Sequence, residues 1–274
     1  MRTIALLMLL AGCAQPNAPA AVAHPRIVSL NLCADEILAE VAAPGQLLAL
    51  SHYSHDPRIS SMTRAQARLF RTTGGTVEEI VALAPDVVVG DRFTPPATRA
   101  ALTRLGVRFA ETPIASDVAG SVAQVRALAR LAGRRAAGEA LIARIERGLA
   151  AASPPPGFAR RSVLVWQGGG LVAGDESLIA ELLSRSGFRP AAATRGLGQG
   201  AILPLEAMIA DPPQVVLTTG DARAEGDRAL RHPALERLRG VSRAELDTRL
   251  LFCGGPTIPR TAARLAQIRR ELGR

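Results

Sequence analysis

A short segment that passes from a helix through a proline into a buried strand most constrains the fold of this chain. Residues 76–90 read Thr-Val-Glu-Glu-Ile-Val-Ala-Leu-Ala-Pro-Asp-Val-Val-Val-Gly. Apolar residues recur at helical spacing from Val77 to Ala84, and Pro85 ends the helix because the residue before a proline disfavours helical geometry. The run Val87–Val89 has no polar alternation, which is typical of a strand covered on both faces of a parallel sheet. The segment predicts the helix-to-strand half of an α/β unit.

The same half-unit occurs a second time. Residues 205–217 align with residues 77–89 without a gap, 128 positions further along the chain (from 77 to 205). Glu206 falls on Glu78, and the proline of one segment coincides with a proline of the other. Two like units so far apart predict two like lobes. A helix followed by a buried strand is common in α/β proteins, so coincidence is the alternative.

The N-terminus has the layout of a secretory signal. Residues 1–12 are apolar except for Arg2, and they are too few for a membrane-spanning helix, which needs roughly 20 apolar residues. The ending Leu-Ala-Gly-Cys resembles the bacterial lipoprotein signal, which implies a lipid on Cys13. Residues 13–25, rich in Ala and Pro, then form a tether. We expect an exported, periplasmic chain anchored to a membrane; an ordinary signal or a buried N-terminal strand is the alternative.

The charge of the chain comes from arginine alone. The net charge is +9, and the sequence contains no lysine, which excludes Walker-type phosphate binding and Schiff-base lysine chemistry. The arginines are scattered and only 3% of the residues are aromatic, so we expect no nucleic-acid partner.

Runs typical of strands and helices alternate along the rest of the chain, which predicts mostly parallel sheets with helices on both faces. Strand-like runs cover residues 26–30, 47–50, 87–89, 107–110, 163–166, 188–191, 215–217 and 250–253. A continuous helical pattern covers residues 134–152 and would reach roughly 28 Å. We therefore predict a first lobe at 26–133, a connecting helix at 134–153 and a second lobe at 154–274.

Three segments, at residues 26–36, 78–89 and 174–178, resemble a known family. Together with the lobe–helix–lobe order and the lipoprotein-like start, they are similar to the substrate-binding proteins of ABC importers for metal chelates, a class that includes vitamin B12, ferric-siderophore and haem binders. The resemblance covers nearly the whole mature chain. It implies two Rossmann-like lobes joined by a single long helix, a ligand cleft between the lobes, and a role in transport without enzymatic activity or a resident cofactor.

The resemblance also implies a docking surface. In that family each lobe presents one exposed glutamate to arginines of the membrane permease. Carried over by position, these residues are Glu78 and Glu206, which would allow a monomeric binding protein to engage a two-fold permease dimer. The alternative is that both are ordinary first-turn glutamates, which suit the helix dipole.

Ligands of open α/β sheets bind beyond the carboxyl ends of the strands, so the residues after each predicted strand are candidate ligand contacts. They are Asn31, His52, Tyr53, Arg92 and Phe93 in the first lobe, and Trp166, Gln167, Thr219 to Asp221 and Gly254 in the second. The chain has one tyrosine and one tryptophan, and both fall in this set, as suits a cleft for a flat macrocycle. Simple packing is the alternative for both.

Some polar groups near these positions permit other chemistry. His52 and His55 are weak candidates for a metal site, because two histidines without a nearby third ligand do not make a free-ion site; an imidazole facing the metal of a chelate is also reasonable. Arg92 is suited to an anionic group of the ligand. Cys33 and Cys253 are expected to be buried free thiols, with a disulfide as the alternative in an oxidising compartment.

Gln167-Gly-Gly-Gly170 follows a predicted strand but does not complete a nucleotide-binding fingerprint. We interpret it as a tight turn or a close approach of the backbone to ligand.

Three functional classes follow. The leading one is the binding component of an importer that captures a metal chelate, with cobalamin favoured over ferric siderophores and haem because residues 26–36 and 174–178 look most like those of B12 binders. A binding protein for free zinc or manganese is the second. An exported α/β enzyme is disfavoured, because the sequence has no nucleophile–base set, no Gly-x-Ser-x-Gly and no metal-ligand cluster.

Overall fold

A computed structural model of the chain describes residues 24–220 and 225–273. The predicted signal peptide, Cys13 and most of the tether lie outside these residues, as does Asp221. Export and lipid anchoring therefore stay predictions.

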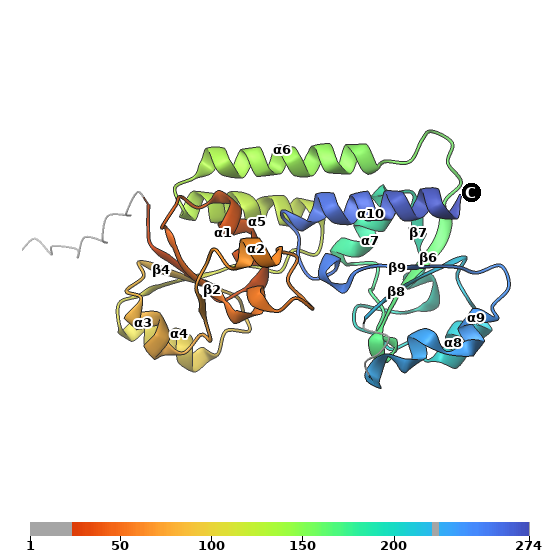
Figure 1. Ribbon diagram of the computed structural model, residues 1–274, viewed down its shortest axis with the longest axis horizontal. Helices are drawn as coiled ribbons and strands as arrows, with labels where there is room; N and C mark the ends of the chain where they lie inside the picture. Colours follow the sequence, from red (N-terminus) through yellow and green to blue (C-terminus); the bar gives the residue numbers. More distant parts are fainter. Residues whose placement is uncertain (1–23, 221–224, 274) are drawn as a thin grey trace, which may run out of the picture.

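Two parallel sheets form the two halves of the molecule (Figure 1). The first has the order β3-β2-β1-β4-β5 and the second the order β7-β6-β8-β9, and every neighbouring pair of strands is parallel. The strands are β1 (Ile27–Ser29), β2 (Leu47–Ser51), β3 (Thr72–Thr73), β4 (Val87–Gly90), β5 (Arg108–Glu111), β6 (Arg161–Gln167), β7 (Phe188–Pro190), β8 (Val215–Thr219) and β9 (Ser242–Glu245). The predicted fold class, two Rossmann-like α/β lobes, is confirmed.

Helices connect the strands and cover the sheets. They are α1 (Leu32–Val41), α2 (Arg64–Ala67), α3 (Val77–Ala82), α4 (Pro96–Arg104), α5 (Val118–Leu131), α6 (Arg135–Ala152), α7 (Leu178–Arg185), α8 (Leu205–Ala210), α9 (Pro233–Glu236) and α10 (Thr257–Leu272). In the part of the chain that the structure describes, no helix is both long and apolar enough to span a bilayer.

The internal repeat is present in three dimensions. Helix α3 leads into β4 in the first lobe, and α8 leads into β8 in the second, with both helices starting and ending at the same separation in sequence. Strands β4 and β8 are buried along almost their whole length, as the unbroken apolar runs predicted. Each lies inside its sheet, next to the strand that opens its lobe.

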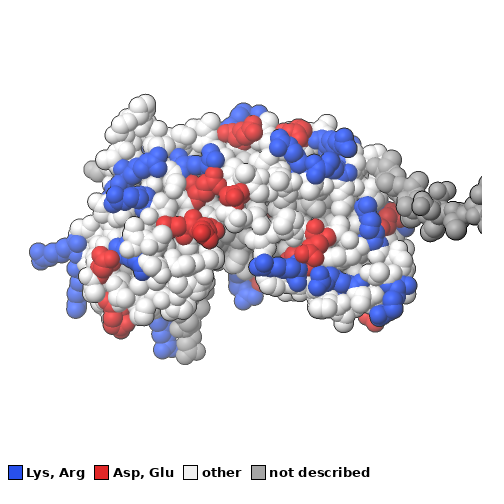
Figure 2. All heavy atoms as spheres, turned by 180° about the vertical axis from the view of Figure 1, so that it is seen from behind, with Lys and Arg blue, Asp and Glu red and all other residues white. Residues whose placement is uncertain are grey.

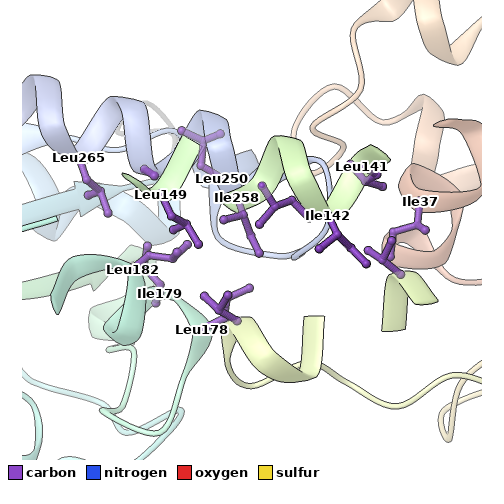
Figure 3. Close-up of a cluster of buried hydrophobic side chains, with 14 of the residues drawn as sticks. Ile37, Leu141, Ile142, Leu149, Leu178, Ile179, Leu182, Leu250, Ile258 and Leu265 are labelled. Atoms are coloured by element: carbon purple, nitrogen blue, oxygen red, sulfur yellow. The ribbon is translucent and has the colours of Figure 1, made fainter. Parts of the chain in front are cut away.

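One hydrophobic core runs through both lobes beneath α6 (Figure 3). Helix α6 packs against α5 and α10, which lie on the same side of the two sheets (Figure 1). The buried side chains of α6 pack with those of α1 in the first lobe and of α7 and α10 in the second. The cluster includes Leu141, Ile142 and Leu149 from α6, together with Ile37, Leu178, Leu182, Ile258 and Leu265. The connecting helix is therefore part of a common core and not a free linker.

Glycines allow α6 to approach both neighbouring helices closely. A Cβ atom added at Gly138 would lie 2.5 Å from the Cβ of Ala129 on α5. One added at Gly148 would lie 2.7 Å from the Cβ of Pro259 on α10. Any larger residue at either position would push the helices apart, so these two glycines set the spacing of the layer.

The seam between the lobes also carries polar and covalent contacts. The backbone N–H of Gly255 donates to Ser121 Oγ at 2.7 Å, and the Thr257 hydroxyl donates to Glu36 Oε2 at 2.6 Å. Glu36 Oε1 accepts from the backbone of Ser61 at 3.0 Å. Helix α1 of the first lobe thus holds the start of α10, which belongs to the second.

Cys33 and Cys253 form a disulfide across this seam, so the prediction of free thiols is wrong. The two residues are 220 positions apart in the sequence, with Cys33 on α1 and Cys253 just before α10. Sequence spacing could not reveal this contact, because packing of α1 against the start of α10 brings the two residues together.

The predicted strand at residues 250–253 is also wrong. Leu250 ends a short 3-10 helix (Thr248–Leu250), and the last strand is the charged segment β9. Leu250 is buried in the common core, and its carbonyl accepts from the Thr261 hydroxyl at 3.1 Å. Leu250 is apolar because it packs in the core shared by the two lobes, and not because it lies in a strand.

Arginine and acidic side chains lie interspersed over the face seen in Figure 2. Exposed Arg126 of α5 forms a bidentate pair with Glu139 of α6 at 2.9 and 3.2 Å. An exposed pair of this kind is typical of a solvated surface.

The disulfide should contribute measurably to stability. Replacing Cys33 and Cys253 together by serine should lower the free energy of unfolding by about 2–4 kcal/mol, because the unfolded chain loses a cross-link that closes a long loop. Urea denaturation of the two proteins measures the difference. Reductant should lower the stability of the unaltered protein by a similar amount and leave the double variant unchanged; equal sensitivity of both proteins would contradict the bond.

Candidate ligand-binding site

The strand order places a candidate site at the carboxyl ends of β1 and β4. From β1 the chain moves outward to β2 and β3 on one side, while β4 and β5 lie on the other. The loops after β1 and β4 therefore diverge and leave a crevice, the usual ligand position in a doubly wound sheet.

A cavity of about 340 Å³ occupies this position in the first lobe. It is lined by residues that end or follow four neighbouring strands, namely Leu30, Ser51, His52, Tyr53, Thr73, Gly74, Gly75, Asp91, Phe93, Thr94 and Pro95. Three of the predicted ligand contacts, His52, Tyr53 and Phe93, thus lie around one cavity.

Two exposed aromatic rings lie at this cavity. Tyr53 is 48% exposed, and its ring centroid is 4.0 Å from that of His52. Phe93 is 69% exposed, and the Arg92 guanidinium lies over its ring at 4.9 Å from the centroid. Each ring thus has one polar neighbour, and its remaining exposed surface can pack against an apolar ligand.

Asn31 does not line the cavity itself but bonds to Asp91, which does. Its side-chain oxygen accepts from the backbone N–H of Ala34 at 2.8 Å and caps α1, while its side-chain nitrogen donates to Asp91 Oδ2 at 2.6 Å. Asp91 Oδ1 accepts from the backbone N–H groups of Phe93 and Thr94 at 2.8 and 3.2 Å. Asn31 thereby couples the loop after β1 to the loop that carries Phe93.

Trp166, in the second lobe, is buried and has no surface exposed to a ligand. Trp166 is 0% exposed, packs in the core of its lobe, and donates its indole N–H to the Leu203 carbonyl at 3.1 Å. The prediction that Trp166 lines the cleft is wrong, because β6 turns this side chain into the buried cluster that it shares with Val172 and Met208. Gln167 follows at the end of β6 and is half-buried.

The glycine run after β6 forms a tight turn against the protein itself. Gly170 has a φ of +81°, and a Cβ atom there would lie 2.8 Å from the Leu203 carbonyl oxygen. The backbone N–H of Leu203 donates to the Gly170 carbonyl at 2.8 Å. The interpretation as a tight turn is confirmed, and the closely approaching backbone is that of Leu203.

A second cavity, of about 530 Å³, lies at the carboxyl ends of β8 and β9. It includes Thr219, one of the expected contacts, and charged groups of both signs, among them Arg231, Glu245 and Asp247. The hydrogen bonds from Arg249 hold the pKa of Asp247 below its usual range. This cavity is more polar than the one in the first lobe, where aromatic rings dominate.

The histidines do not build a free-ion site. His55 Nε2 lies 2.9 Å from the Ala67 carbonyl oxygen, so this nitrogen carries a proton and donates. Within residues 24–220 and 225–273, no three His, Cys, Asp or Glu side chains come together as metal ligands. His52 remains exposed at the cavity.

Asp35, in the first turn of α1, is a buried acid behind the cavity that the sequence did not single out. It is 0% exposed, and its Oδ2 accepts from the Ser51 backbone at 3.1 Å and from the hydroxyls of Ser51 and Ser54 at 2.5 and 2.6 Å. Burial raises the pKa of Asp35 to about 7, although hydrogen bonds from neighbouring serines oppose the rise. No sequence signal distinguishes it from the equally acidic Glu36 beside it.

The two predicted docking residues lie on corresponding helices. Glu78 and Glu206 are exposed, each in the first turn of its helix, α3 or α8. Helices α3 and α8 lie at the end of each lobe away from the layer formed by α5, α6 and α10 (Figure 1). Neither carboxylate makes a hydrogen bond or ion pair with the described residues, so both are free to meet a partner.

The architecture agrees with a match between this sequence and a known family. The model of the periplasmic binding protein family matches residues 27–242, which include the whole first sheet and the second sheet up to the start of β9. The chain belongs to this family. A search of curated protein sequences finds no match.

Solved structures of other periplasmic binding proteins share the fold. The haem-binding protein of Pseudomonas aeruginosa superposes with a TM-score of 0.68 at 23% identity, over 89% of this chain and 92% of that one. HutB, a haem-binding protein of Vibrio cholerae, gives 0.71 at 18% identity, over 90% and 99%. BtuF, a vitamin B12 binding protein of Vibrio cholerae, gives 0.67 at 17% identity, over 91% and 98%.

The buried carboxyl of this periplasmic binding protein should make its stability depend on pH. Because the pKa of Asp35 is raised from 3.8 to about 7, its contribution to the free energy of unfolding is complete below 3.8 and is lost as the pH rises through 7. Relative to Asp35→Asn, the unaltered protein should therefore lose stability between about pH 4 and about pH 7.

Urea denaturation across this range measures the difference. Asp56→Asn is the matched control: Arg58 lowers the pKa of Asp56 to about 2, so removal of that carboxylate should change stability by a constant amount above about pH 4. A protein whose stability stays constant or rises relative to Asp35→Asn as the pH increases from about 4 to about 7 would contradict the burial.

Proposed function

We propose that this protein is the substrate-binding component of an ABC importer and that it captures a metal chelate for delivery to a membrane permease. The observation that carries the proposal is the aromatic cavity at the crevice of the first sheet, in a two-lobed chain of the periplasmic binding protein family. The protein performs no chemical reaction on its ligand.

The chemistry of the cavity supports a large, partly apolar ligand. Tyr53 and Phe93 offer ring surface, while His52 and Asp91 offer polar groups, which is the usual composition of a site that binds an organic molecule. The proteins of similar fold bind haem or vitamin B12. Cobalamin is the first candidate, on the resemblance of residues 26–36 and 174–178 to B12 binders, followed by ferric siderophores and haem.

Calorimetric titration of the purified protein tests the function directly. Cyanocobalamin, haemin and a panel of ferric siderophores are added in turn, and saturable binding of one intact chelate at about micromolar affinity or tighter is expected. Binding of zinc or manganese salts alone, sensitive to chelator, would instead support a free-metal binding protein. Turnover of a chelate would support an exported α/β enzyme.

Removal of either aromatic ring from the cavity should weaken binding of the chelate. Tyr53→Ala and Phe93→Ala should each raise Kd about tenfold, because loss of one packed aromatic contact costs on the order of 1.4 kcal/mol. Leu105→Ala is the matched control, since Leu105 is 57% exposed at the end of α4 and does not line the cavity. Equal effects of all three substitutions would place the ligand elsewhere.

We also propose that Glu78 and Glu206 dock the protein on arginines of a two-fold permease dimer. Both are exposed carboxylates without a partner among the residues that the structure describes, on helices that correspond in the two lobes. Complementary charge at such sites raises the rate and specificity of association.

Charge reversal at these two residues should abolish transport and spare ligand binding. The double variant Glu78→Arg/Glu206→Arg is compared by uptake assay with Glu139→Arg, a single charge reversal at an exposed position of α6 that pairs, among the described residues, only with Arg126, and by titration for ligand affinity. We expect loss of uptake in the first variant only, with Kd unchanged in both. Weaker ligand binding in the double variant would assign the glutamates to the cavity or to the fold.

The working form is proposed to be a periplasmic monomer held to the membrane by a lipid on Cys13. Cys13→Ser should shift the processed chain from the membrane fraction to the soluble fraction.

A further inference from the structure

The ligand cavity of the first lobe has a buried carboxyl group directly behind its wall. Ser51 lines the cavity, and both its backbone N–H and its hydroxyl donate to Asp35 Oδ2. Asp35 itself is on α1 and has no exposed surface. One residue, Ser51, therefore separates the Asp35 carboxyl from the cavity.

Asp35 Oδ2 accepts hydrogen bonds from two residues of the segment that carries the proposed ligand contacts. His52 and Tyr53 lie in a single 3-10 turn, His52–His55. Ser51 precedes this turn and Ser54 lies within it, and both hydroxyls donate to Asp35 Oδ2. The position of the Tyr53 ring thus depends on whether Asp35 stays beneath the turn.

No described positive charge compensates an ionised Asp35. Its other oxygen, Oδ1, is buried without a close hydrogen-bond partner among the described residues, and the nearby Ser29 hydroxyl is the neutral group that most lowers the pKa of Asp35. The neighbouring acidic side chains have other hydrogen-bond partners. Glu36 accepts hydrogen bonds from Thr257 and Ser61, and Asp91 accepts one from Asn31. The imidazoles of His52 and His55 are the titratable groups on the turn itself, and His55 is committed to the Ala67 carbonyl.

We propose that Asp35 is a positioning residue of the ligand site, and that its ionisation loosens the His52–His55 turn and weakens the grip on ligand. A neutral carboxyl group is stable in this buried site. A carboxylate without a counter-charge is destabilised there, and contact with water lowers its free energy. Water can reach Asp35 only if the turn above it moves, since Ser51 and Ser54 cover the oxygen that they bond. The part of the proposal that concerns ligand rests on the proposed function; the part that concerns the turn does not.

Burial places this ionisation within the physiological range, because it raises the pKa of Asp35 to about 7. The turn is therefore held firmly at mildly acidic pH and loosens as the pH rises through neutrality. Ligand affinity should therefore decrease as the pH rises through neutrality.

The lone tyrosine of the chain provides a test that needs no ligand. Full-length protein in detergent is labelled with ring-¹³C tyrosine, so that the NMR signal of Tyr53 stands alone. We expect its chemical shift to change with a midpoint near the pKa of Asp35, about 7, and the transition to be absent in Asp35→Asn. Asparagine keeps the size of the side chain and an oxygen acceptor for the serines.

Two further variants keep the test decisive. Because imidazoles also change charge between about pH 5 and 8, the transition must persist in His52→Gln/His55→Gln. In Ser54→Ala the midpoint should move upward, because a hydrogen bond that favours the carboxylate is lost. A transition that survives Asp35→Asn, or a flat signal in the unaltered protein, would overturn the proposal.

Titration with cyanocobalamin and haemin at about pH 6 and about pH 8 completes the test. For the chelate that binds, we expect Kd roughly tenfold higher at the upper pH, the effect of one pKa unit of linkage, and no change in Asp35→Asn. If neither chelate binds but the tyrosine transition depends on Asp35, the choice of ligand fails and the positioning role stands. Equal pH dependence of Kd in both proteins would overturn the link to ligand.

Discussion

The common hydrophobic core beneath α6 is the contact on which the rest of the structure depends. Each lobe has a small sheet of four or five strands, and the helices that cover one side of both sheets share a single core. Separation of the lobes would expose that apolar surface to water at roughly 25 cal/mol per Å². Relative motion of the lobes is therefore costly before any ligand is present.

Hydrogen bonds and a disulfide between the lobes fix the relative orientation that the apolar contact alone would leave less specific. Glu36, Ser121 and the disulfide from Cys33 all hold the segment between Cys253 and Thr257, where the chain enters α10. Hydrogen bonds that are buried and satisfied, together with a covalent link, specify one arrangement of the lobes. Because these contacts restrict motion of one lobe against the other, we expect ligand capture to depend mainly on local movement at the proposed site, including the His52–His55 turn.

Local chemistry at the cavity follows from the same helix that holds the seam. Helix α1 carries Asn31 at its N-cap, Cys33 and Glu36 toward the second lobe, and Asp35 toward the turn of His52 and Tyr53. Consecutive residues of a helix point in different directions, so one short segment serves both the ligand site and the lobe contact. This explains why a change at Asp35 is expected to act on the site and on stability together.

The sequence by itself determined the two-lobe α/β organisation, the connecting helix and the strand ends that surround the cavity. These follow from short-range periodicity, from Pro85, and from the repeat that pairs Glu78 with Glu206. Only the tertiary structure decided that Trp166 is buried, that Cys33 meets Cys253 and that Asp35 lies behind Ser51. Each of these depends on which face of an element meets a distant one, and periodicity gives the face of a helix or strand but not the partner that covers it.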